Sequence, residues 1–271
     1  MKKKIFTALF ALVALFTLAA CSSSNSSSSH TYTIGVVGSS DENIWKGVAK
    51  QLKASDGITL NVKVFSDYTL ANPAVQDGSL DLNAFQHIAF LDNWNQENKG
   101  SLVQIGYTVI SPFGLYSKKI SNYKDLKDGD TVAIPNDPTN GGRALQLLAA
   151  IGVITLKSNA PASPAVKDIQ TYNKKITIKP LAADQIVAAL PDVTAACINT
   201  DFVRDQMHTT PEKSALYIDT DHLAKVSQIY KNVIVVKGSN KNNPDFAKIV
   251  KAYQTDTVAK EIKAQGNIPA W

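Results

Sequence analysis

The 271-residue sequence predicts an α/β protein made of two halves, each of which alternates strands with helices. In the first half, apolar runs at 32–37 and 60–65 flank a segment with helical spacing, which predicts a βαβ unit with parallel strands. In the second half, the buried run at 131–134 leads through a turn into a helix that ends at Gly152. The predicted strands end in polar residues, so we expect a ligand cleft between two domains.

The N-terminal segment has the pattern of an export signal and is excluded from the fold. Three lysines precede an apolar run at 5–18, and the run ends in Leu-Ala-Ala-Cys21, which resembles a bacterial lipobox. The resemblance implies a signal peptide at 1–20, a lipidated Cys21 and a Ser-rich tether within 21–30. The protein would then be exported and lipid-anchored to the outer face of the bacterial cytoplasmic membrane, at the cell surface or in a periplasm. An ordinary secretion signal and an uncleaved membrane helix are the alternatives, although the run is short for a span.

Charge and cysteine content exclude several classes of protein. The leader carries three of the 28 basic residues, so its removal lowers the formal net charge from +5 to +2. No basic run remains that would indicate a nucleic-acid partner. Cys197 is then the only cysteine available for redox chemistry, and its apolar surroundings at 193–198 favour a small buried side chain over a nucleophile.

No metal, cofactor or catalytic motif is expected. The four histidines, at 30, 87, 208 and 222, are scattered without the spacing of metal ligands. The turn at 135–142 lacks Gly-Lys-Ser/Thr and contains no G-x-G-x-x-G, so it is neither a P-loop nor a dinucleotide fingerprint. Ser39, Ser40 and Cys197 lack a recognisable elbow or base, and we therefore expect a binding protein and not an enzyme.

The remaining elements follow from periodicity and from breaker residues. We expect a Pro-Phe-Gly break at 112–114 to mark a crossing between domains. The other expected helices and strands are helices at 43–54, 72–78, 120–126, 183–190, 244–253 and 257–264, and strands at 102–110, 176–178, 193–198 and 230–236.

The stretch 131–156 carries a candidate anion site. Thr139 or Asn140 can cap its helix, which places Arg143 in the first turn, where a cation opposes the helix dipole. Free backbone N–H groups and a forked guanidinium together favour a carboxylate, and Gly141 and Gly142 would let it approach the backbone. An exposed arginine on an ordinary connection is the alternative, and spacing alone does not separate the two.

A second informative stretch, at 81–94, places Phe85, His87 and Phe90 within six residues. They form either an apolar binding slot, in which His87 supplies one polar group, or a set of core aromatic residues around a buried histidine. Further candidates also lie at strand ends or helix starts, and asparagine amides can both donate and accept, which suits a zwitterion. The additional candidates are Tyr68, Asn140, Asn199 and Asn232.

From Tyr32 to Trp271 the chain resembles the methionine-binding lipoproteins of the MetQ/NlpA type, which are substrate-binding proteins of ABC importers. The most specific motifs are the Asn-Asp-Pro-Thr-Asn run at 136–140 with Gly142-Arg143, and the Phe-Gln-His run at 85–87. Asp67-Tyr68, Tyr116-Ser-Lys-Lys119, Ile198-Asn-Thr200, 252–256 and the terminal Trp add to them. The resemblance implies the two-lobed type II periplasmic-binding-protein fold with a ligand cleft between the lobes. It places lobe 1 at 31–112 and 233–271, lobe 2 at 113–232, and two hinge crossings near 112–115 and 231–233.

The resemblance also implies roles for the candidate residues. Arg143 would bind the ligand carboxylate, and three asparagines, Asn140, Asn199 and Asn232, would bind the amino-acid backbone. The side-chain slot would be formed by Tyr68, Phe85, His87 and Phe90. The expected ligand is an amino acid, L-methionine first. The expected partners are an ABC permease with its ATPase and, through the lipid anchor, the membrane, and a monomer is expected.

Three positions depart from the family pattern and concern the ligand. Gly141 stands where larger apolar residues are common, Phe90 replaces a frequent tyrosine, and Asp201 occupies a position that is usually small or neutral. A carboxylate near the mouth would favour an extra ammonium group, as in a peptide or a diamino acid. A binder of a different amino acid or a short peptide, and a lipid-anchored surface adhesin, therefore remain alternatives.

Overall fold

The computed structural model describes residues 30–220 and 228–271. The predicted signal peptide, Cys21, the tether up to residue 29 and His222 lie outside the described residues. None of the helices in the described part of the chain is both long and apolar enough to cross a membrane.

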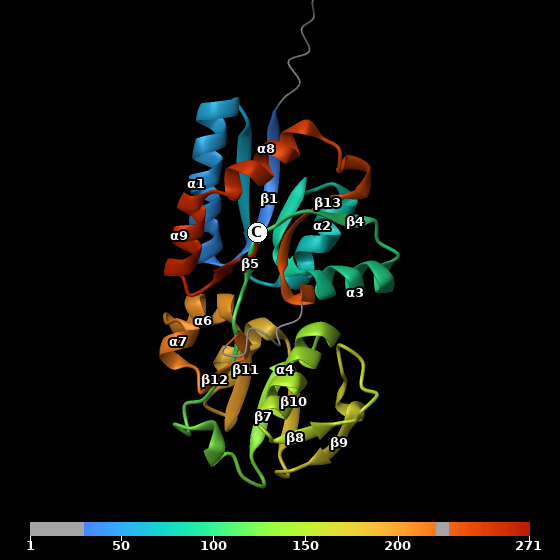
Figure 1. Ribbon diagram of the computed structural model, residues 1–271, viewed down its shortest axis with the longest axis vertical. Helices are drawn as coiled ribbons and strands as arrows, with labels where there is room; N and C mark the ends of the chain where they lie inside the picture. Colours follow the sequence, from blue (N-terminus) through green and yellow to red (C-terminus); the bar gives the residue numbers. More distant parts are fainter. Residues whose placement is uncertain (1–29, 221–227) are drawn as a thin grey trace, which may run out of the picture. The chain divides into compact units, whose positions relative to one another are not determined.

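The first five-stranded sheet is built from the N-terminal part of the folded chain and from β13, and helices close to the C-terminus pack on it (Figure 1). Its elements are β1 (Thr31–Val37), α1 (Ser39–Asp56), β2 (Thr59–Phe65), α2 (Ala71–Asp77), β3 (Leu82–His87), α3 (Ile88–Asn98), β4 (Leu102–Tyr107), β13 (Asn232–Lys237), α8 (Pro244–Tyr253) and α9 (Asp256–Ala264). The strand order is β2-β1-β3-β13-β4. Strand β1 pairs in parallel with β2 and β3, whereas β13 runs antiparallel to β3 and β4. The predicted βαβ unit and its parallel pairing are therefore confirmed.

Alternating residues of the central strands bury both faces of this sheet. Ile234 and Val236 face the cluster built by α1, α8 and α9, in which Trp45 stacks on Tyr253 at 4.6 Å between ring centroids. Val233 and Val235 belong instead to the cluster that α2 and α3 cover. Figure 1 shows α1, α8 and α9 gathered beside β1, with α2 and α3 beside β13 and β4. A strand buried on both faces reads as a continuous apolar run, which is why 232–236 was predictable.

The second five-stranded sheet is formed by the middle of the chain. Its strands and helices are β6 (Phe113–Tyr116), β7 (Thr131–Pro135), α4 (Pro138–Ala150), β10 (Thr177–Leu181), α5 (Ile186–Ala189), β11 (Ala195–Asn199), α6 (Thr200–Met207), α7 (Pro211–Ser214) and β12 (Tyr217–Ile218). The order is β10-β7-β11-β6-β12, in which β10, β7 and β11 are parallel. Helix α4 covers one face, and α5 and α6 cover the other. Cys197 is fully buried among the apolar side chains of the α4 face, as predicted.

The chain passes between the two sheets in two places. It leaves the first sheet after β4 and reaches β6 through β5 (Val109–Ile110), which pairs with the C-terminal β14 (Ile268–Pro269). It returns between β12 and β13. The expected strand at 102–110 is thus two strands, and the break at 112–114 coincides with the first passage.

Several predicted elements were wrong in extent or were missed. The expected helix at 120–126 is only a 3-10 turn at Tyr123–Asp125. The hairpin of β8 (Ile154–Leu156) and β9 (Ile169–Tyr172) was missed, because Pro-rich sequence separates two short strands that pair with a register shift. Helices α6 and α7 were missed because both are short, at eight and four residues.

Candidate functional site

A cavity open to solvent is lined by residues of both sheets and of the first passage between them; the space between its lining atoms is about 510 Å³, open solvent included. All eight predicted site residues line it: Tyr68, Phe85, His87, Phe90, Asn140, Arg143, Asn199 and Asn232. The sequence reasoning missed Val37, Gln86, Ser111, Pro112, Phe113, Thr200 and Phe202, which also line the cavity. Most of these are apolar or small, and no pattern in the sequence distinguishes them from core residues.

Arg143 is buried, so the alternative of an exposed surface arginine is wrong. It is the sixth residue of α4 and therefore lies in the second turn, not in the first as predicted. Its Nε donates to Oδ2 of Asp219 at 2.7 Å, and its Nη2 donates to the carbonyl of Ser111 at 2.9 Å. The planar guanidinium also lies 4.5 Å from the ring centroid of Tyr230. These contacts hold a cation at the cavity wall in one orientation.

The cap of α4 is Asp137, and the prediction of Thr139 or Asn140 was wrong. The Asp137 carboxylate accepts from the backbone N–H groups of Thr139 and Asn140 at 3.2 and 2.9 Å, and Pro138 occupies the first helical position. A proline there is compatible with the fixed φ of a helix start and needs no N–H acceptor. Because Asp137 already takes these backbone donors, they are not free for a ligand anion, and Arg143 supplies a cationic donor at the cavity wall.

Tyr68 reaches Asp137 from the first sheet. Its hydroxyl donates to Oδ2 of Asp137 at 2.5 Å. Burial, and then the Asp137 charge, raises the pKa of Tyr68 well above its ordinary value, so the phenol keeps its proton and acts as a donor. Tyr68 therefore contributes its ring to the cavity while its hydroxyl is engaged with the α4 cap.

The two glycines before Arg143 serve the packing of α4, not the approach of an anion. A Cβ on Gly141 would lie 2.8 Å from the carbonyl oxygen of Pro135, and one on Gly142 would lie 2.9 Å from the Ser163 backbone. Both glycines line a separate hollow beside 163–166 and do not line the cavity that contains Arg143. The expectation that they expose the backbone to a ligand is therefore wrong.

Gly142→Ala should destabilise the protein by about 1–2 kcal/mol, because a new methyl group against backbone atoms cannot be relieved by a side-chain rotation. A matched control is Gly47→Ala in α1, where a Cβ would meet no atom within 4 Å. Higher helix propensity should stabilise that variant by about 0.8–1 kcal/mol. Urea unfolding of the three proteins measures both changes, and equal behaviour of the two variants would contradict the packing role of Gly142.

His87 ends β3 and is a neutral part of the cavity wall. Its Nδ1 accepts from the backbone N–H of Phe90 at 3.1 Å, so the ring proton lies on Nε2, 3.3 Å from Oδ1 of Asn140. Burial, and then the Arg143 charge, lowers the pKa of His87 to about 4. The histidine is therefore uncharged at neutral pH and caps α3 from the preceding strand.

Within the described part of the chain, the hydrogen bonds of the asparagines leave the Oδ1 atom of Asn199 open in the cavity. Oδ1 of Asn140 accepts from Nδ2 of Asn199 at 2.9 Å, and Asn232 donates to the carbonyl of Phe85 at 3.2 Å. Oδ1 of Asn199 is buried and has no hydrogen-bond partner among the described residues. A buried acceptor without a donor is unfavourable, so this oxygen is suited to a donor on a ligand.

The aromatic residues form a continuous apolar wall. Ring centroids of Tyr68 and Phe90 are 5.4 Å apart, those of Phe85 and Phe90 are 6.0 Å apart, and Phe202 lies 6.1 Å from Tyr68. Phe85 and His87 lie on β3 and Phe90 on α3, so their close spacing in sequence reflects a strand-to-helix junction. The apolar-slot interpretation of this stretch agrees with their place in the cavity lining.

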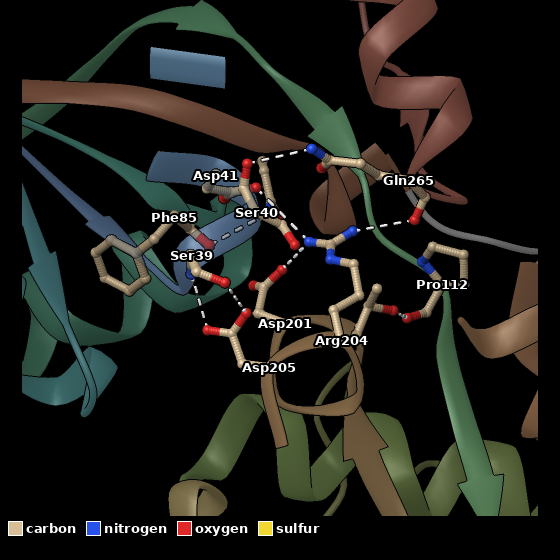
Figure 2. A network of polar contacts seen from close by, with 11 residues as sticks. Ser39, Ser40, Asp41, Phe85, Pro112, Asp201, Arg204, Asp205 and Gln265 are labelled. Carbon is tan, nitrogen blue, oxygen red and sulfur yellow. Dashed lines mark hydrogen bonds and ion pairs between the residues drawn. The ribbon is translucent and has the colours of Figure 1, made fainter. Parts of the chain in front are cut away.

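Asp201 lines the cavity but already has an internal cation. Its carboxylate is bonded to Arg204, one turn along α6, and Arg204 also lies 3.6 Å from Asp41 of α1 (Figure 2). Burial raises the pKa of Asp201, and Arg204 opposes that effect. An extra ammonium on a ligand would compete with Arg204 for this carboxylate, which weakens the expectation that Asp201 selects a diamino acid.

The same region explains why α1 begins earlier than expected. Ser39 donates its backbone N–H and its hydroxyl to the Asp205 carboxylate, both at 2.8 Å (Figure 2). An anion at a helix N-terminus satisfies free N–H groups and complements the dipole. The sequence predicts a later start, at residue 43, because the group that caps α1 comes from α6, 166 residues away.

Comparison with known proteins assigns the family. A model of the NlpA lipoprotein family matches residues 32–271. The chain belongs to the NlpA lipoprotein family. This family consists of substrate-binding lipoproteins of transporters and is not an enzyme family.

NlpA-family relatives match along most of their length. The chain is 34% identical to the D-methionine-binding lipoprotein MetQ of Salmonella typhi over 275 residues, which cover 100% of the chain and 99% of the relative. It is 37% identical to outer membrane lipoprotein 3 of Mannheimia haemolytica, with 83% of each protein covered.

Solved structures of similar proteins confirm the predicted α/β substrate-binding-protein fold of this NlpA-family chain. The crystal structure of the methionine-binding protein MetQ matches with a TM-score of 0.84 and 34% identity, covering 89% of this chain and 98% of that one. A nutrient-binding protein from Burkholderia cenocepacia bound to methionine matches with a TM-score of 0.83 and 37% identity, covering 89% and 100%. The resemblance inferred from the sequence motifs is thus confirmed at the level of the family.

Proposed function

We propose that this chain is the substrate-binding lipoprotein of an ABC importer and that it binds one amino acid, with methionine as the first candidate. The observation that supports this most is the cavity itself, which combines a buried cation, a buried acceptor that has no partner in the described part of the chain, and an aromatic wall. A zwitterion with an apolar side chain has a matching group for each of these three features.

Each part of an amino acid has a partner of suitable chemistry. The carboxylate would accept from Arg143, since burying an anion is favourable only beside a fixed, hydrogen-bonded cation. The ammonium would donate to Oδ1 of Asn199, and Asn140 and Asn232 would complete the polar end. A thioether against the edges of Tyr68, Phe85 and Phe90 contributes about 0.3–1.5 kcal/mol per contact.

The two sheets and their two connections support a closing mechanism. In this proposal, lobe 1 comprises 31–112 and 233–271, lobe 2 comprises 113–232, and the lobes close on the ligand about the passages near 112–115 and 231–233. Closure removes water from the ion pair and strengthens it. The loaded monomer would then deliver its ligand to a membrane permease and its ATPase.

The N-terminal pattern supports the location of the protein. Cleavage before Cys21 and lipidation of its sulfur would hold the protein at the outer face of the cytoplasmic membrane, with the Ser-rich segment as a tether.

Ligand-dependent thermal unfolding tests the proposed function. The protein is unfolded and refolded to remove carried-over ligand, and is then melted with L-methionine, D-methionine, the other amino acids and short peptides. A ligand at 1,000 times its Kd should stabilise the protein by about 4.1 kcal/mol. Stabilisation by methionine is the expected result. Stabilisation by another amino acid or a peptide alone would transfer the function to that ligand, and no stabilisation by any of them would contradict it.

A further inference from the structure

Among the described residues, the contacts of the Arg143 guanidinium leave its Nη1 nitrogen for a ligand. Oδ2 of Asp219 accepts from Nε and also lies 2.7 Å from Nη2. The second hydrogen of Nη2 is used by the carbonyl of Ser111. Nη1 has no hydrogen-bond partner within residues 30–220 and 228–271.

Two aromatic rings also lie against the guanidinium. The rings of Tyr230 and Phe113 have their centroids 4.5 and 5.2 Å from the Cζ atom of Arg143. Tyr230 is itself tied to α4, because its hydroxyl donates to Oε1 of Gln146 at 3.0 Å. A ligand carboxylate therefore has Nη1 available, since Nε and Nη2 are already engaged by Asp219 and Ser111.

Asp219 is held so that both of its oxygens accept. Oδ2 accepts from Arg143, while Oδ1 accepts from the backbone N–H of Phe113 at 2.9 Å. Only a carboxylate supplies two acceptor oxygens in this way. An asparagine would turn an NH₂ group toward either the Phe113 N–H or the guanidinium, and two donors would then face each other.

We propose that Asp219 is the positioning residue of Arg143: it occupies the Nε–Nη2 edge, neutralises the buried cation in the empty protein, and leaves Nη1 for the ligand carboxylate. This role rests on the proposed function. The role of Asp219 extends the proposed function, because it assigns carboxylate recognition to Arg143 and Asp219 together. In the protein without ligand, the opposite charges of these two side chains then cancel. Such a site suits a zwitterion better than a ligand with a net negative charge, because a second anion would meet Asp219 without a second cation.

Asp219→Asn tests the positioning role when two ligands are compared. The ligands are the methionine enantiomer that the wild-type protein binds more tightly and the corresponding methioninamide, which has no carboxylate. Calorimetric titration should show a loss of about tenfold to hundredfold for methionine and of less than about threefold for the amide. Asp219→Glu keeps two acceptor oxygens and should lose less methionine affinity than Asp219→Asn.

Asp192→Asn is the matched control, since it removes the same charge from an exposed turn. A ligand-free readout accompanies the titrations: the Nε–H resonance of Arg143 should be protected from exchange in the wild-type and Asp192→Asn proteins and should lose that protection in Asp219→Asn. If Asp219→Asn does not fold, Asp219→Glu decides by the same comparison, with a larger loss for methionine than for the amide expected.

Several outcomes would overturn the positioning role. If Asp219→Asn loses the same affinity for methionine as for methioninamide, Asp219 has a merely structural role. If Asp219→Asn binds methionine as tightly as the wild-type protein or more tightly, Asp219 competes with the ligand carboxylate for Arg143. A wild-type protein that binds neither ligand would refute the proposed function, and the role of Asp219 in recognition would fall with it. Methionine binding by the wild-type protein, combined with full retention in Asp219→Asn, would refute the positioning role alone.

Discussion

Arg143→Gln should lower the affinity for the amino acid by about 100- to 1,000-fold, equivalent to about 2.7–4 kcal/mol. Glutamine keeps the bulk and one donor but removes the cation that a desolvated carboxylate requires. Because Arg143 is 4% exposed, water cannot replace it in the closed cavity. Titration of the refolded variant with the wild-type ligand measures the loss.

The fold should survive this substitution. Asp219 keeps its bond to the Phe113 backbone, and 17% of its side chain is exposed, so its charge retains some solvation after the guanidinium is removed. Arg143→Lys is the informative comparison, since lysine keeps the positive charge but lacks the forked guanidinium that donates to Asp219 and to Ser111 at the same time. Lysine should recover part of the affinity. Ligand binding by Arg143→Gln at wild-type strength would exclude carboxylate recognition by Arg143.

Local patterns were sufficient for the parts of the site that lie next to one another in sequence. Buried strands read as apolar runs, and most of the predicted site residues lie near an end of such a run or near the start of a helix. Asp137 could have been recognised as well, because a proline in the first helical position points to the preceding residue as the cap. The Gly141-Gly142 pair misled the prediction, since a glycine in sequence does not say whether a ligand or the chain itself needs the space.

Partners that come from distant segments were not predictable. Asp219 is 76 residues from Arg143, and Asp205 is 166 residues from the helix that it caps. Neither has a local pattern that separates it from an ordinary surface aspartate. Asp201 was recognised as unusual, but its charge was assigned to a ligand because nothing in a one-dimensional pattern shows whether Arg204 points toward it.

Arg204→Met should lower the stability of the protein by about 3 kcal/mol at pH 8 and by less than about 1 kcal/mol near pH 4.5. Arg204 is 6% exposed at its side chain and is the cation between Asp41 and Asp201 (Figure 2). Methionine has similar length and no charge, so the substitution removes the cation while largely preserving packing. For a domain of this size, the melting temperature changes by about 2–4 °C for each kcal/mol of stability. Thermal melts across a pH series therefore resolve the difference.

The direction of the pH dependence follows from the carboxyl groups. Burial, and then repulsion by Asp201, raises the pKa of Asp41 from 3.8 to about 8, and Arg204 opposes this rise. The folded protein therefore holds a proton that the unfolded chain releases between these two values, so the contribution of Asp41 to stability falls as the pH rises through that interval. Without Arg204 the pKa values of Asp41 and Asp201 should rise further. Arg204→Met should accordingly lose most stability at the higher pH values, at which the carboxyl groups of Asp41 and Asp201 would otherwise be charged.

Lys46→Met is the control for this experiment, because Lys46 pairs with Glu42 on the same helix α1 but its side chain is 60% exposed. An exposed pair of this kind contributes roughly 0.3–0.5 kcal/mol, and its loss should depend little on pH in this range. A loss in Arg204→Met that is the same at pH 4.5 and pH 8 would mean that the charge of Arg204 is not what matters. The bond from its Nη1 to the carbonyl of Gln265, which joins α6 to the C-terminal segment, would then account for its contribution.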